Sequence, residues 1–104
     1  MEPLMVFITC PNDEEAARLA RAAVAETLAA CGNIVPGLRS IYRWQGEVHD
    51  DPETLLILKT SGEKYPALEA CIQELHPYDV PEILALPVQR GLGAYLDWMA
   101  DSLS

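Results

Sequence analysis

The side chains of this chain best suited to chemistry are its thiols and imidazoles. There are three cysteines, Cys10, Cys31 and Cys71, and two histidines, His49 and His76. An odd number of widely spaced cysteines without a C-x-x-C pair is no disulfide framework, so in a reducing compartment each is expected to be a small buried apolar residue. A thiol and an imidazole brought together could instead bind a borderline metal ion.

His76 has the more informative surroundings of the two histidines. It ends a predicted helix, and Tyr78, Asp79 and Glu82 follow within six residues. Imidazole and carboxylate in one tight segment, joined by a cysteine from a neighbouring strand, would suit a metal ion. The competing interpretation is a helix-stop loop in which His76 caps backbone carbonyls. His49 lies in the acidic segment EVHDDPE and is expected at a solvated hairpin tip.

Lys59 is the only lysine inside an apolar strand-like run, TLLILKT. Its ammonium group is expected to extend from the end of the strand or to pair with Glu53, Glu82 or Asp79. A structural ion pair is the simpler interpretation. The alternative is a small polar pocket, between subunits in an assembly, that is walled by Trp44, Lys59, Tyr78 and Glu82.

Motifs of catalysis and phosphate binding are absent. The chain lacks G-x-x-x-x-G-K-[ST], G-x-G-x-x-G, G-x-S-x-G and H-E-x-x-H. An acylphosphatase-type enzyme would need a phosphate-binding loop and an arginine after the first strand, but residues 9–14, TCPNDE, are acidic there. We therefore expect a protein that is not an enzyme.

Length and composition narrow the class further. The 104 residues fit one compact domain, residues 1–104, and the 50% hydrophobic content excludes a disordered chain. Seven basic against 16 acidic residues give a net charge of −9, which excludes a general nucleic-acid binder. No run approaches the roughly 20 apolar residues that cross a membrane. The N-terminus MEPLMVFITC lacks the positive charge of a signal peptide, so we expect a cytoplasmic protein without membrane contact.

Seven elements are expected to position these residues. Apolar patterning predicts strands over 5–10, 34–44, 54–60 and 83–86, and helices over 65–75 and 94–103. A first helix begins at an Asn12 N-cap, with Glu15 completing a capping box, and runs to about Ala30, where Gly32 ends it. This order predicts an α+β, ferredoxin-like βαββαβ fold with an additional C-terminal helix and a four-stranded antiparallel sheet.

Prolines and glycines mark irregular points in the second and third strands. Pro36 cannot donate to a strand ladder, which places residues 36–37 at an edge, in a bulge or before the strand proper. Gln45-Gly46 predicts a turn, and Asp50-Asp51-Pro52 breaks the strand pattern after it. The resulting hairpin, from 45 to about 53, is too short for a long signalling loop.

Helices in this fold cover only one face of the sheet. The predicted strand 5–10 is apolar without alternation and is expected to be buried on both faces, and the other strands also lack a purely polar face. Self-association would bury that surface and cap the sheet edges. An oligomer is therefore a physical expectation.

Several segments together resemble the CutA family of divalent-cation tolerance proteins. They are TCPNDEEA (9–16), LAACGNIVPGLRSIYRWQGEV (28–48), TLLILKT (54–60), HPYDVPEILALPV (76–88) and AYLDWM (94–99). The resemblance implies a ferredoxin-like protomer in a tight homotrimer, in which the long second and third strands reach onto neighbouring subunits. The intersubunit strand would then carry Tyr42, Arg43, Trp44 and Gln45.

The resemblance also implies copper or another divalent cation as the ligand. The family pattern has a cysteine at the end of the first strand and two adjacent histidines before Pro-Tyr. In this sequence Thr9 occupies the position of that cysteine, and Cys10 lies one residue after it. Leu75 replaces the first histidine, and His76 corresponds to the second. Cys31 matches the cysteine of the LAAC segment. The metal ligands expected from the resemblance are Cys10, Cys31 and His76.

The predicted function is therefore a trimeric copper-binding protein of metal-ion tolerance. The alternative is a trimeric small-molecule sensor similar in architecture to PII signalling proteins, or a scaffold for protein interactions. A nucleotide or an organic acid that stabilises the protein would favour the sensor.

Overall fold

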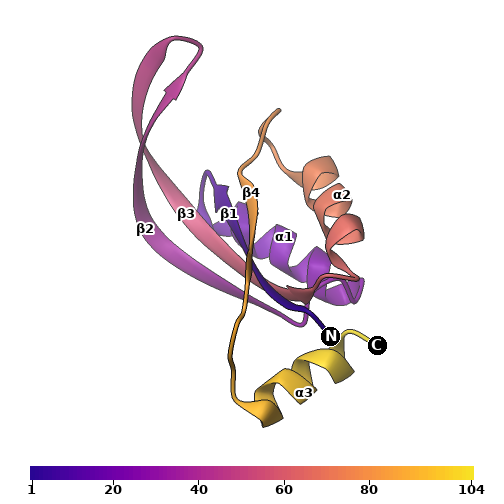
Figure 1. The fold of residues 1–104 in the computed structure, drawn as a ribbon. Helices are drawn as coiled ribbons and strands as arrows, with labels where there is room; N and C mark the ends of the chain where they lie inside the picture. Colours follow the sequence, from indigo (N-terminus) through magenta and orange to yellow (C-terminus); the bar gives the residue numbers. More distant parts are fainter.

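The computed structural model describes all 104 residues as a single chain of four strands and three helices (Figure 1). In chain order these elements are β1 (Pro3–Cys10), α1 (Asp13–Ala25), β2 (Cys31–Trp44), β3 (Glu47–Ser61), α2 (Tyr65–Leu75), β4 (Ile83–Pro87) and α3 (Gly93–Ser102). The order and class of the elements match the sequence-based prediction. No helix has the length and apolarity to cross a membrane.

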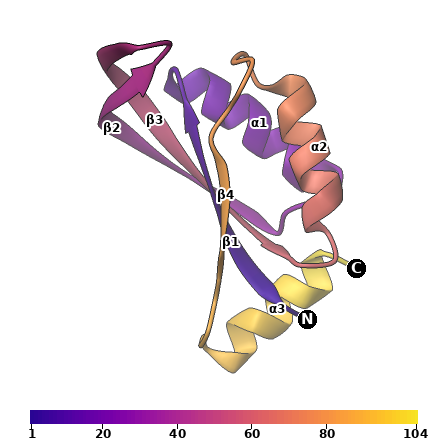
Figure 2. The ribbon, with the colours of Figure 1, turned by 45° about the horizontal axis from the view of Figure 1, so that its top comes forward.

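The strands form one antiparallel sheet in the order β2-β3-β1-β4, as the ferredoxin-like arrangement requires. Helices α1 and α2 lie together on one face of this sheet (Figure 2). The β2–β3 hairpin extends well beyond the other strands, and α3 lies near the opposite end of the sheet (Figure 1). Strands β2 and β4 are the two edges.

The core lies between the sheet and helices α1 and α2. Val6 and Ile8 of β1 pair with Leu58 and Leu56 of β3, and all four side chains are fully buried. The alternate β1 side chains are only partly buried, so the expectation that this strand is buried on both faces is wrong for the single chain. The outer face of the sheet keeps an apolar surface that no element of the chain fully covers.

Helix α1 begins as its sequence predicts. The Asn12 side chain accepts a hydrogen bond of 2.9 Å from the Glu15 backbone N–H. The Glu15 carboxylate does not return to Asn12 but pairs with Arg18, so only half of the predicted capping box forms. Three acidic residues in the first turn face the positive end of the helix dipole.

Replacing Asn12 with alanine is expected to lower the free energy of unfolding by about 1 kcal/mol, because one N–H at the start of α1 loses its acceptor. Urea denaturation would measure the change. The matched control is Asn33→Ala, at an exposed position of β2 outside any helix cap. Equal losses in both variants would contradict a capping role for Asn12.

Helix α1 ends earlier than predicted, at Ala25 rather than near Ala30. Thr27 has a φ of 60°, in the left-handed region, and the chain leaves the helix there. The segment that follows is held by β3, since Thr60 Oγ1 donates to the Leu28 carbonyl and the Ala30 N–H donates to the Lys59 carbonyl. Sheet contacts thus replace helical hydrogen bonds that the alanine-rich sequence favours locally.

Gly32 does not end a helix, as predicted, but lies in β2 beneath α1. A Cβ atom on Gly32 would be 2.9 Å from the Ala20 Cβ and 3.1 Å from a methyl carbon of Leu58. Real Cβ atoms essentially never come as close as the first of these distances, and the second is tighter than nine in ten real Cβ contacts. The absence of a side chain therefore permits close packing between helix and strand.

Strand β3 is longer than predicted and runs through Asp50, Asp51 and Pro52 without a break. The prolyl nitrogen is tolerated because β1 ends opposite Thr54, so beyond that point only one side of β3 has a neighbour. Pro36 and Gly37 form a bulge in edge strand β2, one of the three placements that the sequence allowed.

Candidate functional site

A cavity lies between the hairpin arm and the α2–β4 segment and is open on one side. Its volume is about 560 Å³, within the range of small-molecule sites. The walls come from the end of β1, the outer parts of β2 and β3, and the segment that leads into β4. The lining residues are Thr9, Ser40, Ile41, Tyr42, Trp44, Glu53, Tyr78, Asp79, Val80 and Glu82.

Two tyrosines of the cavity donate to carboxylates. The Tyr78 hydroxyl donates to Glu53 Oε2 at 2.8 Å, and the Tyr42 hydroxyl donates to Asp51 Oδ2 at 2.6 Å. Burial and the hydrogen bond to Glu53 raise the pKa of Tyr78, and the hydrogen bond to Asp51 raises the pKa of Tyr42. Both hydroxyls therefore stay protonated at physiological pH and fix the carboxylates that they touch.

The charge of the cavity is negative. Glu53, Asp79 and Glu82 line it, and no lysine, arginine or histidine does. Partial burial raises the pKa of Glu82, and the negative charge of Glu53 adds to the effect. An anion would meet only like charge here, whereas a cation would relieve the repulsion between the carboxylates.

The pKa of Glu82, raised by burial and then by the charge of Glu53, predicts a pH-dependent effect of Glu82→Gln. A folded-state pKa above the unfolded value means that ionising Glu82 opposes folding at neutral pH, and the effect disappears as pH falls below about 4.5. The variant should raise the free energy of unfolding at pH 7 by a few tenths of a kcal/mol, because solvent screens this partly exposed group. Urea titrations at about pH 7 and about pH 3.5 would measure the change, and an equal gain at both would contradict the electrostatic cause.

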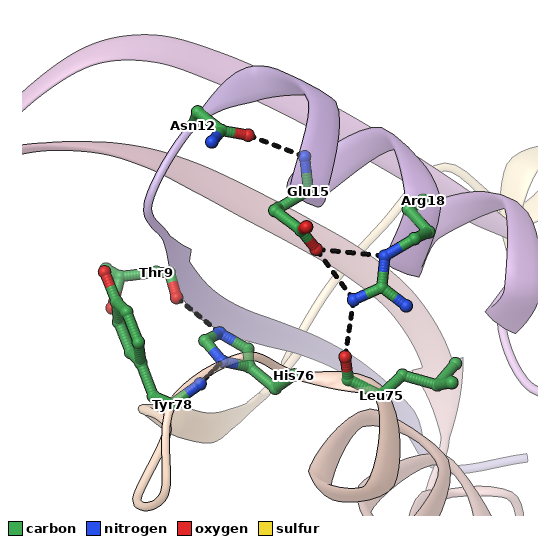
Figure 3. Close-up of polar contacts among 7 residues, drawn as sticks. All are labelled: Thr9, Asn12, Glu15, Arg18, Leu75, His76 and Tyr78. Carbon is green, nitrogen blue, oxygen red and sulfur yellow. Dashed lines mark hydrogen bonds and ion pairs between the residues drawn. The ribbon is translucent and has the colours of Figure 1, made fainter.

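His76 shapes the segment that forms one wall of the cavity. Its ring is buried, with Nε2 2.8 Å from the Thr9 carbonyl oxygen and Nδ1 3.1 Å from the Tyr78 backbone nitrogen (Figure 3). A backbone N–H can only donate, so Nδ1 accepts and Nε2 carries the proton that is donated to Thr9. Both ring nitrogens of a neutral imidazole are thereby used, and the chain after α2 is tied to the end of β1.

A second link holds the end of α2 beside His76. Arg18 of α1 donates through Nη2 to the Leu75 carbonyl and pairs with Glu15 at 2.7 Å (Figure 3). In one interpretation of the sequence, the His76 side chain caps the last carbonyls of α2. In the structure, Arg18 takes part of this role, because it donates to the Leu75 carbonyl. The His76 side chain instead joins the end of β1 to the segment after α2 through backbone groups of Thr9 and Tyr78.

The three expected metal ligands do not meet within one chain. Cys10 pairs with Thr54 and Cys31 with Lys59, which separates the two cysteines by about 17 Å along β3. Burial and the charge of Glu53 raise the pKa of the Cys10 thiol to about 11, which disfavours the thiolate that binds metals. No group of three His, Cys, Asp or Glu residues in the chain could hold a metal ion.

The cysteines differ in accessibility. Cys10 is fully buried, as expected, but Cys31 and Cys71 are partly exposed, so the expectation of burial is wrong for them. Cys31 begins the edge strand β2, and its sulfur lies 3.8 Å from Asn33 Oδ1. Of the expected metal ligands, Cys31 is the one that solvent reaches.

Lys59 is not part of the cavity, whereas Trp44, Tyr78 and Glu82 line it. Lys59 lies six residues along β3 from Glu53, about 20 Å away, and so cannot form the predicted ion pair with it. Its Nζ lies 3.3 Å from the Tyr95 hydroxyl and 5.4 Å from the centroid of that ring. Lys59 therefore helps to attach α3 to the sheet.

The residues expected at a trimer interface all lie at the end of the β2–β3 hairpin. Tyr42, Arg43 and Trp44 are exposed at the end of β2, and Gln45 opens the turn. Gln45 and Gly46 both have positive φ, 51° and 82°, as in a two-residue type I′ turn. His49 is stacked on Tyr42 within the paired strands rather than at the tip, which corrects its predicted place.

Thr9, Ser40 and Glu53 belong to the cavity but were not predicted as site residues, and Asp79 was considered only in a metal-binding segment with His76. Ser40 alternates with Tyr42 and Trp44, so the period-2 pattern of the strand could have indicated it. Glu53 and Asp79 become neighbours of these residues only through strand register and the path of the chain after α2. No local sequence signal carries that information.

The sheet order and helix placement define an α+β protein of the ferredoxin-like class. The family model of the CutA1 divalent ion tolerance protein matches residues 4–102, and the chain belongs to this family. Its members are divalent-cation tolerance proteins rather than enzymes.

Individual relatives agree with this assignment. The divalent-cation tolerance protein CutA of Thermus thermophilus is 54% identical over 98 residues, which cover 94% of this chain and 95% of the relative. Protein CutA of Mus musculus is 45% identical over 93 residues, which cover 89% of this chain and 52% of the relative, so this chain spans about half of that protein.

Solved structures of the family have the same fold. The Thermus thermophilus structure superposes with a TM-score of 0.95 at 52% identity and covers 98% of this chain and 99% of that one. CutA1 from Oryza sativa superposes with a TM-score of 0.96 at 44% identity and covers 100% of this chain and 95% of that one.

Proposed function

We propose that this protein works as a homotrimer that binds divalent cations, copper in particular, in metal-ion tolerance. The observation that carries the assembly is the uncovered outer face of the sheet. Leu84 and Leu86 of β4 are 60% and 45% exposed there, and Trp44 at the hairpin end is 45% exposed. An apolar face of this kind on a single chain is typical of an interaction surface.

Both edges of the sheet also lack partners. β2 pairs only with β3 and β4 pairs only with β1, so each offers a row of unpaired backbone groups. Two different open edges on one chain favour head-to-tail contacts, and such contacts close into a ring when the rotation between copies permits. In a ring of three copies, both sheet edges of every copy would pair with edges of the neighbouring copies.

The assembly can be tested by the mass of the purified protein in solution. Multi-angle light scattering should give three times the 11.5 kDa chain mass. Trp44→Asp should reduce that mass by placing a charge in the interface, whereas Asp97→Asn, at an exposed position of α3, should not. A monomeric unmodified protein would overturn the proposal.

Metal binding is proposed to use donors from more than one chain. Support comes from the family, from the negative charge of the chain, and from the absence of any three-donor group within one copy. Cys31 is the accessible thiol among the expected ligands, and soft thiolates suit copper(I).

Titration with copper(II), and with copper(I) under anaerobic conditions, would test this. Cys31→Ser should abolish tight binding, whereas Cys71→Ser, which removes a partly exposed thiol on α2, should leave it unchanged. Identical isotherms for both variants and the unmodified protein would exclude Cys31 as a ligand. The solution mass, measured separately, keeps a failure of metal binding distinct from a failure of assembly.

A further inference from the structure

The hairpin arm, residues 38–53, projects from the sheet as a ribbon of two strands (Figure 1). Strand β1 ends opposite Thr54, so each strand of the arm pairs only with the other. None of the arm residues is buried, and its base is tied to the rest of the chain by the hydrogen bond between Glu53 and Tyr78. Ribbons of two strands are marginally stable at best in water. The shape of the arm in a free chain therefore depends on contacts within the arm itself.

One face of the arm carries a bidentate ion pair. Arg39 Nε donates to Asp50 Oδ1 at 2.8 Å, and Arg39 Nη2 donates to Asp50 Oδ2 at 2.7 Å. Pro52 is the residue directly opposite Arg39, so the pair crosses the ribbon diagonally towards the turn. Two parallel hydrogen bonds of this kind fix geometry as well as charge. A slip of one residue between the strands would move the two side chains to opposite faces, so the pair also specifies the register.

The other face of the arm has a second diagonal contact. The Tyr42 hydroxyl donates to Asp51 Oδ2 at 2.6 Å, and the Tyr42 ring stacks on the directly opposite His49 ring with 5.2 Å between centroids. Side chains alternate between the faces of a strand, so this contact and the pair of Arg39 with Asp50 lie on opposite faces. The two strands of the arm are thus linked across both faces without help from the core.

We propose that these contacts keep the arm paired before copies of the chain meet, which makes Arg39 and Asp50 positioning residues for assembly. The inference rests on the proposed homotrimer, in which the arm reaches a neighbouring copy. A chain with an open arm cannot dock, so the association rate falls with the fraction of chains whose arm is paired. An exposed ion pair adds little to global stability, but local opening of a segment with so few other contacts responds to small changes.

Refolding kinetics would test the proposal. Urea-unfolded protein is diluted to several final concentrations while the fluorescence of Trp44 and Trp98, the two tryptophans, is followed. The phase whose rate rises with protein concentration reports association. Asp50→Ala should slow this phase several-fold, whereas Glu63→Ala, which removes the same charge from an exposed position outside the arm, should leave it unchanged. Equal association rates in Asp50→Ala and the unmodified protein would overturn the proposal.

An exchanged pair separates a contact within the arm from a contact with a neighbouring copy. The double variant Arg39→Asp with Asp50→Arg restores the ion pair inside the arm but inverts both charges towards any neighbour. It should recover most of the association rate that Arg39→Asp alone loses. Failure to recover it would mean that the two side chains act across the interface between copies, and the positioning role would be wrong.

Solution mass and subunit exchange distinguish this inference from the proposed function. Each variant should still reach the mass of three chains, and its labelled and unlabelled copies should exchange at the rate of the unmodified protein, because neighbouring copies hold the arm after assembly. Faster exchange would place the effect of the pair in the assembled form and contradict the proposal. A monomeric unmodified protein would overturn the homotrimer and this inference together, whereas a trimer whose association does not depend on Asp50 would overturn this inference alone.

Discussion

Replacing His76 with alanine is expected to lower the free energy of unfolding by about 2–4 kcal/mol, the largest effect of any single polar substitution in this chain. The ring is only 6% exposed and forms two hydrogen bonds to backbone groups. Its removal leaves the Thr9 carbonyl and the Tyr78 N–H without partners and creates a void where α2, β1 and the following segment meet. Burying such unpaired groups accounts for most of the loss.

Chemical denaturation at a fixed protein concentration would measure this effect, because the stability of an assembled protein depends on concentration. His49→Ala is the control, since the His49 ring is stacked on Tyr42 in the hairpin and forms no hydrogen bond to a buried group. A loss below about 1 kcal/mol in His76→Ala would show that the two hydrogen bonds contribute little net stability.

The second large effect is expected from Gly32→Ala. The added Cβ would lie 2.9 Å from the Ala20 Cβ, and neither atom is the end of a flexible side chain. Helix α1 must therefore move away from the sheet, at a cost of about 1–3 kcal/mol, as is usual for overpacked cores.

A double-mutant cycle with Ala20→Gly tests this cause. Ala20→Gly alone should cost about 1 kcal/mol through helix propensity, and it removes the atom that the new methyl group would meet. The double variant should then lose clearly less than the sum of the two single losses. Strict additivity would mean that the cost of Gly32→Ala has another origin, such as the backbone conformation of β2.

The fold could be predicted from the sequence because its elements are specified locally. Asn12 and the three acids after it set the start of α1, and Gln45-Gly46 sets the hairpin turn. Errors arose where tertiary contacts overrode local preference. Residues 26–30 favour helix but are held by β3, and Pro52 is tolerated because β1 has already ended.

The candidate site was less predictable than the fold. Trp44, Tyr78 and Glu82 line one cavity of the single chain, whereas the pocket predicted from them lies between subunits and stays a prediction. Within one chain Lys59 lies apart from these three residues, because the register of β3 places it far from Glu53. The chemistry of His76 could not be read from sequence either, because the Thr9 carbonyl that occupies its Nε2 lies 67 residues earlier.

The place of β1 within the sheet has a consequence for synthesis. This strand is central, yet it is the first to leave the ribosome, and Ile8 must wait for Ile83, about 75 residues later, before its pairing with β4 can form. At translation rates of about 5–20 residues per second, that delay is roughly 4–15 seconds. The apolar run from Met5 to Ile8 is unpaired for much of that time, so nascent chains are expected to depend on chaperones to escape aggregation.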